Sequence, residues 1–186
     1  ETGVRCAVLG SRGLVAQRLL QRLSNHHWLA PVCVVGSSES EGMKVSEIPW
    51  SFSETKPSLP DLRIIGIGQN GELASHLISE GVRIVFSALP DSPASYIEEE
   101  LAKAGLVVIS HSTVHRHSEV IPLVVPGVNN DHLGLIDLQS GFGKGMLVSC
   151  PNCMVVPLGI SIAPLIRSLP VRKITITTEQ SLSGGG

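Results

Sequence analysis

Short apolar runs and amphipathic segments alternate along most of the chain. The amphipathic segments place leucine and other apolar residues at helical spacing, and they span 14–23, 72–79 and 93–104. Between them lie runs typical of buried strands, at 4–9, 31–35, 62–67, 82–86 and 106–109. This repeated alternation of strand and helix predicts an α/β fold, with a doubly wound, mostly parallel sheet covered by helices on both faces.

The pattern changes near the end of the sequence. Residues 172–178 alternate between polar and apolar side chains, which predicts a half-exposed strand of an antiparallel sheet. We therefore expect one domain at 4–150 and the beginning of a second, α+β catalytic or dimerisation domain at 151–186. Because domains commonly contain on the order of 150 residues, we expect the rest of the second domain to be missing from this sequence.

The composition is that of an ordinary globular protein. The 186 residues are 42% hydrophobic and 16% charged, with a net charge of −2, so a core can form and no basic surface for nucleic acid is expected. No apolar run reaches the roughly 18 residues that a membrane helix needs. Four cysteines do not make a disulfide framework, and no signal peptide is visible, so we expect a reducing, cytoplasmic location.

A glycine turn joins the first strand to the first helix. Gly10, Gly13 and Ala16 form a G-x-x-G-x-x-A pattern, a variant of the G-x-G-x-x-G dinucleotide fingerprint in its required strand–turn–helix context. Gly10 allows a sharp turn, Gly13 lets the backbone approach a pyrophosphate, and Ala16 lets the helix pack close to the strand. Glycine is common at any such junction, but this one opens the first unit, so it predicts a Rossmann-like nucleotide-binding domain.

The loop after the second strand favours NADP over NAD. A carboxylate at this place would hold a ribose and repel a 2′-phosphate, but the first side chains here are the hydroxyls of Ser37 and Ser38. Arg12, in the neighbouring glycine loop, adds a cation that suits a 2′-phosphate. The alternative is a plain polar loop with a solvated arginine, and Glu39 counts against the NADP interpretation.

Several loops are expected to meet at one edge of the sheet. In parallel sheets ligands bind beyond the carboxyl ends of the strands, where Gly10, Ser37, Ser87 and His111 would lie together. The loop that begins at His111 is polar and basic, and its Arg116 could clamp an anion through two hydrogen bonds. A solvated surface cluster explains this loop equally well.

Cys153 is the candidate nucleophile. It lies between a short strand at 146–149 and an apolar helical segment at 155–166, in a turn that Pro151 fixes. A cysteine just ahead of a helix meets unpaired backbone N–H groups and the positive end of the helix dipole. Both favour the thiolate, which is the nucleophilic form.

Other interpretations of the cysteines stand beside this one. Cys150 and Cys153 form a C-x-x-C, which could be a redox pair or half of a zinc site. A zinc site needs about four ligands, and the sequence has no second C-x-x-C, so we expect no metal. A buried structural cysteine is the commonest fate of the residue, and it fits Cys6 and Cys33, which lie in apolar strands.

Taken together, several motifs resemble aspartate-β-semialdehyde dehydrogenases, particularly the archaeal and fungal-like branch. The matching stretches are 10–16, 85–90, 108–110 with His115 and Arg116, 126–129, 151–153, and Gln180 with Ser183 and Gly184. Pro-Asn-Cys at 151–153 is the most specific of them. The likeness covers almost the whole chain, but only the early part of the family's second domain.

The resemblance implies an activity and roles for individual residues. The family reduces L-aspartyl 4-phosphate with NADPH to L-aspartate 4-semialdehyde and phosphate, in the synthesis of lysine, threonine and methionine. Cys153 would form a thioester, Gln180 would position the substrate, and Arg116 and Asn152 would bind it. The implied cofactor-binding residues are Gly10, Arg12, Gly13, Leu14, Val15, Ser37, Ser38, Ser87, Ser183 and Gly184. Family members pair through the second domain, which implies a homo-oligomer.

The chain also departs from the family pattern. His111 replaces the usual asparagine of the phosphate loop, Ala16 a glycine, Gly127 a glutamate, and Met154 a hydroxyl residue after the nucleophile. The general acid/base histidine and the arginine that binds the substrate carboxylate would lie beyond Gly186. A positioned proton-transfer group contributes about 10²–10⁴-fold, so we expect this chain not to turn over efficiently by itself.

Three rival functions remain open at this stage. N-acetyl-glutamyl-phosphate reductase uses the same acyl-phosphate chemistry, but its motif reads Pro-Gly-Cys. A truncated or degenerate relative that binds a dinucleotide without catalysis would explain His111 and Met154. A redox switch through Cys150 and Cys153 is the third.

Overall fold

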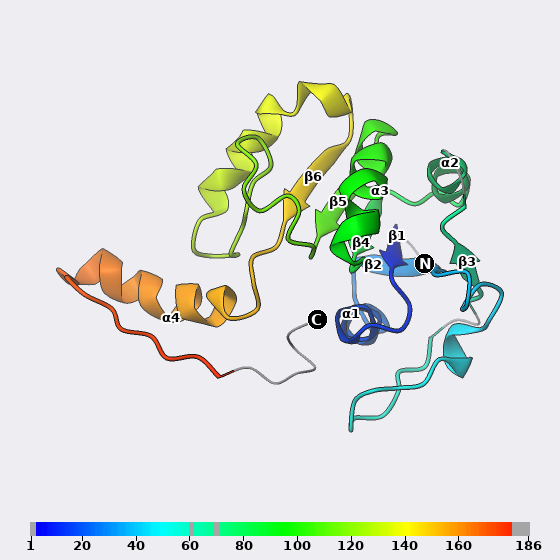
Figure 1. The fold of residues 1–186 in the computed structure, drawn as a ribbon, viewed down its shortest axis with the longest axis horizontal. Helices are drawn as coiled ribbons and strands as arrows, with labels where there is room; N and C mark the ends of the chain where they lie inside the picture. Colours follow the sequence, from blue (N-terminus) through cyan, green and yellow to red (C-terminus); the bar gives the residue numbers. More distant parts are fainter. Residues whose placement is uncertain (1–2, 60–61, 69–70, 180–186) are drawn as a thin grey trace.

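The computed structural model describes residues 3–59, 62–68 and 71–179, and it contains one six-stranded parallel sheet (Figure 1). The strands are β1 (Val4–Leu9), β2 (Leu29–Gly36), β3 (Ile64–Gly66), β4 (Ile84–Ser87), β5 (Val107–Ser110) and β6 (Met146–Ser149). The α-helices are α1 (Leu14–Leu23), α2 (Glu72–Ser79), α3 (Asp91–Lys103) and α4 (Val155–Ser168). Short 3₁₀ segments lie at Val45–Glu47, Asn130–Leu138 and Ser140–Phe142.

The strand order is β3-β2-β1-β4-β5-β6, so the chain winds in two directions from the middle of the sheet. This order is that of a Rossmann fold, and the direction of winding reverses between β1 and β4. The predicted doubly wound parallel sheet is therefore confirmed, and the glycine turn after β1 lies at the reversal point, where such sheets bind ligands.

Two apolar layers hold the sheet between its helices. On one face, Leu9, Val85 and Leu147 pack against the layer formed by α2 and α3, which includes Leu77 and Leu101. The other face carries a second cluster of buried residues around α1. It consists of Cys6, Val8, Ala16, Leu20, Leu23, Val34, Val45, Ile48 and Ile64. Figure 1 shows α1 on the opposite side of the sheet from α3. Burial of these side chains is the main force that fixes the sheet against its helices.

The segment 172–178 does not form the predicted strand. Residues 170–179 have no regular secondary structure, and all of them are exposed. A strand needs a neighbour for its backbone hydrogen bonds, and none of the described strands pairs with this segment. Its alternating pattern is therefore present without the sheet that the pattern predicts.

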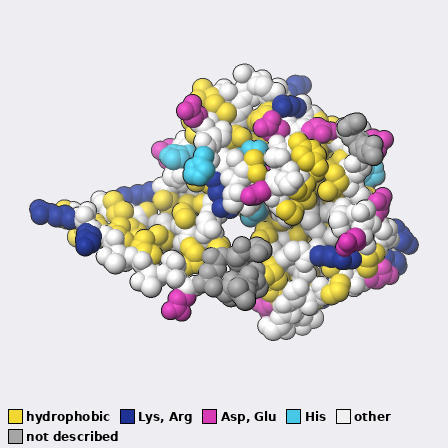
Figure 2. Space-filling view, in the orientation of Figure 1, with side chains coloured by type: hydrophobic (Ala, Val, Ile, Leu, Met, Phe, Trp, Pro, Cys, Tyr) yellow, Lys and Arg dark blue, Asp and Glu magenta, His cyan; other side chains and the backbone are white. Residues whose placement is uncertain are grey.

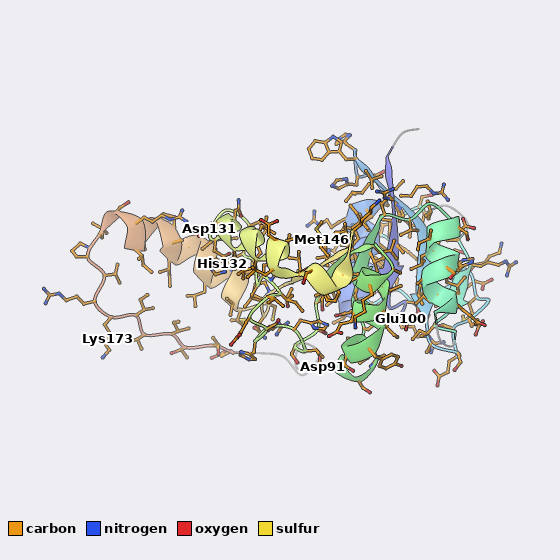
Figure 3. All side chains as sticks on the ribbon, turned by 90° about the horizontal axis from the view of Figure 1, so that it is seen from above. Asp91, Glu100, Asp131, His132, Met146 and Lys173 are labelled. Carbon is orange, nitrogen blue, oxygen red and sulfur yellow. The ribbon has the colours of Figure 1, made fainter. Side chains whose placement is uncertain are left out.

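Helix α4 lies apart from the sheet. None of its residues is buried, and Val155, Ile160, Leu165 and Ile166 are each 44–55% exposed. Figure 2 shows apolar side chains along an arm that extends from the body of the molecule. Lys173, in the segment after the helix, lies far from the sheet in Figure 3. No helix in the described part of the chain is long and apolar enough to cross a membrane.

Candidate functional site

The loops that follow the strands begin at one common edge. The first backbone N–H beyond a strand donates to the neighbouring strand in four places along this edge. These bonds are Gly10 to Val35 (2.8 Å), Ala88 to Leu9 (2.8 Å), His111 to Ser87 (3.0 Å) and Cys150 to Ser110 (2.7 Å). The predicted meeting of the loops after β1, β2, β4 and β5 is confirmed, and the loop of Cys150 after β6 joins them.

Gly10 is required by the backbone of the turn. Its φ is +98°, a left-handed conformation that side chains disfavour, and a Cβ would lie 3.0 Å from the carbonyl oxygen of Ala88. Gly13 precedes α1 with nothing within 4 Å of a Cβ position, and no side chain caps this helix. The first N–H groups of α1 are therefore open toward solvent, in the arrangement that binds phosphate groups.

Two buried serines tie the glycine turn to the loop after β2. The hydroxyls of Ser11 and Ser40 lie 3.1 Å apart, and Ser40 also donates to the carbonyl of Ser37 at 3.1 Å. Both pack over the α-carbon of Gly36, where any Cβ would clash with their oxygens at 2.5–2.6 Å. This contact leaves the Ser37 and Ser38 side chains exposed beside the turn.

Arg12 lies at the same place, where it contacts Glu39, Gln17 and the Met43 sulfur. Its guanidinium lies 3.4 Å from the Glu39 carboxylate, and its carbonyl accepts a hydrogen bond from the buried Gln17 amide at 2.8 Å. The Arg12 and Glu39 side chains are 49% and 78% exposed, so their ion pair contributes only about 0–1 kcal/mol. The guanidinium can therefore leave Glu39 for another anion at small cost.

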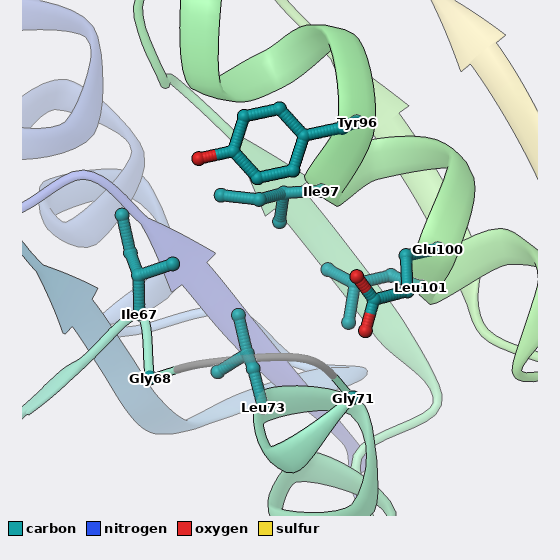
Figure 4. Close-up of a pocket in the computed structure, with 8 residues that line it drawn as sticks. All are labelled: Ile67, Gly68, Gly71, Leu73, Tyr96, Ile97, Glu100 and Leu101. Atoms are coloured by element: carbon teal, nitrogen blue, oxygen red, sulfur yellow. The ribbon is translucent and has the colours of Figure 1, made fainter.

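A groove runs between α1 and the loop after β5. It has a volume of about 290 Å³ and is lined by Leu14, Val15, Arg18, Leu19, Arg22 and His111. This volume is close to the lower end of ligand sites, about 300–1,000 Å³. A second cavity, between the start of α2 and the second half of α3 (Figure 4), measures about 30 Å³. That space holds one or two water molecules, whereas the groove along α1 is large enough to take part of a nucleotide.

His111 lies half-buried at the end of this groove. Its Nδ1 is 3.0 Å from the carbonyl oxygen of Ser87, so Nδ1 carries the proton and donates it. Burial lowers the pKa of His111 and the neighbouring Arg116 lowers it further, while the Ser87 carbonyl and Glu98 oppose the shift. The imidazole is therefore neutral near pH 7.

Arg116 links the loops after β5 and β6. Its Nε donates to the Cys150 carbonyl and its Nη2 donates to the His111 carbonyl, each at 3.1 Å. A guanidinium carries five N–H donors, and these bonds use two of them. Arg116 is thus fixed next to the cysteine turn with donors left for an anion.

Cys153 is exposed in the turn between β6 and α4. Asn152 shapes this turn, because its side-chain oxygen accepts the Met154 N–H at 2.9 Å and its carbonyl accepts the Val155 N–H at 2.9 Å. The Cys153 sulfur lies 3.7 Å from the same Asn152 side-chain oxygen. The sulfur is therefore accessible, and its position is set by the start of α4.

The other cysteines have less reactive environments. Burial raises the pKa of Cys150, although Arg116 opposes the shift. Burial raises the pKa of Cys6 to about 12 and that of Cys33 to about 11. Among the described residues, no three His, Cys, Asp or Glu side chains gather into a possible metal site.

Some residues expected at the site are placed differently or lie outside the structure. The Ser87 side chain is completely buried, so its hydroxyl faces the interior rather than the edge. Gln180, Ser183 and Gly184 lie outside the described residues.

Sequence reasoning missed two buried groups near the edge. One is Gln17, which joins the Arg12 carbonyl to the segment at Pro49 and Ser51. The other is the contact between Glu98 and His115 under the loop of Arg116. The only sequence signal for either group was a polar residue at a helix position that faces the core.

We predict that Cys153 is the fastest thiol to be alkylated in the folded protein at pH 7. Cys153 is exposed, whereas burial disfavours the thiolates of Cys150, Cys6 and Cys33. Iodoacetamide labelling followed by peptide mass spectrometry measures the order. Cys153→Ser should remove the fast phase, and denaturant should make all four thiols react. Equal rates at Cys150 and Cys153 would contradict the assignment.

We predict that His111→Asn stabilises the fold relative to the parent protein as the pH falls below 6.5. The pKa of His111 is lowered in the folded protein, whereas in the unfolded chain His111 takes up a proton near the ordinary histidine pKa of 6.5. Acid therefore favours the unfolded parent, and the variant lacks this effect. Urea unfolding at pH 7.5 and pH 5.5 measures the difference between the two proteins. A difference that does not change with pH would refute the role of His111.

Comparison with known proteins gives a consistent result. Residues 5–136 match the family model described as semialdehyde dehydrogenase, NAD binding domain. An aspartate-semialdehyde dehydrogenase of Archaeoglobus fulgidus is 35% identical over 184 residues, which cover 96% of this chain and 51% of that protein. A malonyl CoA reductase (NADP) of Metallosphaera sedula is 32% identical over a match that covers 98% of this chain and 50% of that protein.

A solved structure shows the same arrangement. The crystal structure of aspartate semialdehyde dehydrogenase with NADP from Candida albicans superposes with a TM-score of 0.73 at 28% identity. The match covers 89% of this chain and 47% of that one. The chain thus spans about half the length of the relatives it matches. Because the family model covers most of the chain, this protein belongs to the semialdehyde dehydrogenase family and carries its NAD-binding domain.

Proposed function

We propose that this chain is the nucleotide-binding part of an NADPH-dependent aspartate-semialdehyde dehydrogenase, which converts L-aspartyl 4-phosphate to L-aspartate 4-semialdehyde and phosphate. One observation carries the proposal: an exposed cysteine and an anchored arginine occupy the same sheet edge as an uncapped glycine turn. Relatives named for this activity, at 35% identity and below, support it. They do not favour the alternative of an N-acetyl-glutamyl-phosphate reductase.

The residues of the edge fit the nucleotide. Gly10 and Gly13 leave the first turn of α1 open for the pyrophosphate, while Leu14 and Val15 line the groove beside it. Arg12, Ser37 and Ser38 are exposed next to the turn and would bind the 2′-phosphate. Ser87 would contribute its backbone only, because its hydroxyl is buried. Ser183 and Gly184 stay predictions.

Cys153 would supply the nucleophile. Its thiolate attacks the acyl carbon of the acyl phosphate. A carbon–sulfur bond forms, and the bond between the acyl carbon and the phosphate oxygen breaks, which releases phosphate. Arg116 would bind the phosphate group and stabilise the negative charge of the leaving phosphate with its remaining donors. A bound nucleotide would supply a hydride to the thioester carbon, and the carbon–sulfur bond would then break to give the semialdehyde and regenerate the Cys153 thiolate.

Asn152 and His111 would shape the acyl site. Asn152 holds the cysteine turn and its side-chain oxygen lies 3.7 Å from the sulfur, so its side chain would lie next to an acyl group on Cys153. His111 is a neutral group at a position where the family has asparagine, so it can form hydrogen bonds there without adding charge. Gln180 is proposed to position the substrate. We further propose a catalytic and dimerisation domain that begins at 151.

We predict that Cys153→Ser abolishes acyl-enzyme formation and leaves NADPH affinity unchanged. The serine hydroxyl is a far weaker nucleophile near neutral pH, and the nucleotide contacts lie elsewhere on the edge. Mass spectrometry after exposure to L-aspartyl 4-phosphate would show the adduct, and calorimetry would give the affinity. Cys150→Ser is the matched control and should still be acylated. An adduct on any residue other than Cys153 would refute the proposal.

We predict that the chain binds NADPH more tightly than NADH, and that Arg12 and Glu39 set the difference. Arg12→Leu should weaken NADPH binding about tenfold, the loss of one charge-assisted contact, with little effect on NADH. Glu39→Gln should tighten NADPH binding about two- to fivefold, because the carboxylate no longer competes for Arg12. Calorimetry measures all three proteins with both nucleotides. Equal dissociation constants for NADPH and NADH in the parent would count against these roles.

A further inference from the structure

A carboxylate and an imidazole are buried together beneath the loop that carries Arg116. Glu98, in the middle of α3, has no exposed surface, and His115 is 4% exposed. Glu98 Oε2 lies 2.9 Å from His115 Nε2, at ion-pair distance although outside hydrogen-bond geometry. Fully buried carboxylates are rare in proteins unless a specific partner holds them.

The same carboxylate reaches the loop at a second point. The Ser112 hydroxyl lies 3.4 Å from Glu98 Oε2 and 2.9 Å from the Ser110 hydroxyl at the end of β5. Asp91, the first residue of α3, is labelled in Figure 3. Its carboxylate accepts a hydrogen bond from the Thr113 N–H at 2.8 Å and another from the Thr113 hydroxyl. Side chains of helix α3 therefore contact the loop at residues 112, 113 and 115.

Stability alone does not account for the buried pair. Replacing a buried ion pair by apolar side chains of similar size is often neutral or stabilising, because the charges lose their hydration. Glu98 Oε1 moreover has no hydrogen-bond partner, which adds to the cost of burying the group. A polar network in this place is explained better by the geometry it imposes on the loop.

The position of Arg116 depends on that geometry. His115 points inward to Glu98, and the next residue, Arg116, extends across to the carbonyls of Cys150 and His111. A shift of the His115 anchor would move the guanidinium relative to the cysteine turn. Misplacement by about 1 Å is enough to weaken a positioned contact strongly.

We propose that Glu98 and His115 are positioning residues, which hold Arg116 in place to bind the phosphate group beside Cys153. This inference rests on the proposed function, because it assumes that Arg116 binds phosphate. The pair itself touches no substrate.

The test measures binding of inorganic phosphate to the full chain at pH 7.5. The ¹⁵N–¹H signal of Arg116 Nε, assigned by its loss in Arg116→Lys, reports the affinity. Each variant is also measured for its unfolding temperature and its NADPH affinity. The variants are Glu98→Gln, which keeps the shape and replaces the carboxyl group by an amide, and the double variant Glu98→Leu/His115→Leu, which fills the site with apolar groups. Glu99→Gln, on the exposed side of α3, is the matched control.

Phosphate affinity should fall about tenfold in Glu98→Gln and in the double variant. Loss of residues that orient metal ligands lowers metal affinity by a similar factor, about 10–100-fold. NADPH affinity should stay within about twofold of the parent value, and the double variant should unfold at or above the parent temperature. Phosphate affinity would then fall without a loss of stability. A pair that only stabilised the fold would not give this result.

Two other outcomes are decisive in different ways. If Arg116→Lys binds phosphate as the parent does, judged by calorimetry, the phosphate role in the proposed function fails. If Arg116→Lys loses phosphate but Glu98→Gln and the double variant bind it normally, only the positioning role is overturned. Should the double variant not fold, the isosteric Glu98→Gln decides the question.

Discussion

The in-register pairing of β1, β4, β5 and β6 is the constraint on which the site depends. Leu9, Ser87, Ser110 and Ser149 are successive register partners, so each strand ends at the same height. The next residue of each chain segment then begins a loop and closes a backbone hydrogen bond to its neighbour. Because a shift of one residue would turn every side chain to the opposite face, the apolar layers that fix the register also fix the site.

The groups proposed to bind anions at this edge have weak or incomplete internal partners. Arg12 is paired with an exposed carboxylate, Arg116 with two backbone carbonyls, and the N-terminus of α1 with no side-chain cap. Each group is oriented before a ligand arrives, yet each keeps donors or can exchange its partner at small cost. Such preorganisation without strong internal pairing suits the proposed site, in which nucleotide and substrate phosphate groups would bind and be released.

The sequence predicted those features that depend on local pattern. Apolar runs located the strands to within a few residues, and the glycine spacing located the turn at Gly10, because both follow from backbone and burial rules within one segment. The Glu98–His115 contact joins a helix to a distant loop, and Glu98 sits in a run of three glutamates that suggests a solvated surface. Only helix phase distinguishes it: Glu98 follows Ala94 and precedes Leu101 on the buried side.

The segment 172–178 failed as a predicted strand for a related reason. Alternation describes a surface with one buried face, but a strand also needs a hydrogen-bonding neighbour, and periodicity carries no information about that neighbour. Helix α4 likewise shows apolar character without burial in the described structure.

Cys153 sits between a well-packed strand and this unpacked helix, but its turn does not rely on helix packing. The turn leaves the sheet at the Cys150 N–H bond to Ser110 and the buried Pro151, and Asn152 then closes it onto the start of α4 through the N–H groups of Met154 and Val155. The strand end before Cys153 is thus tied to the same sheet edge as the glycine turn. In the proposed function, the nucleophile and the nucleotide would therefore be held at one edge by the register of the sheet.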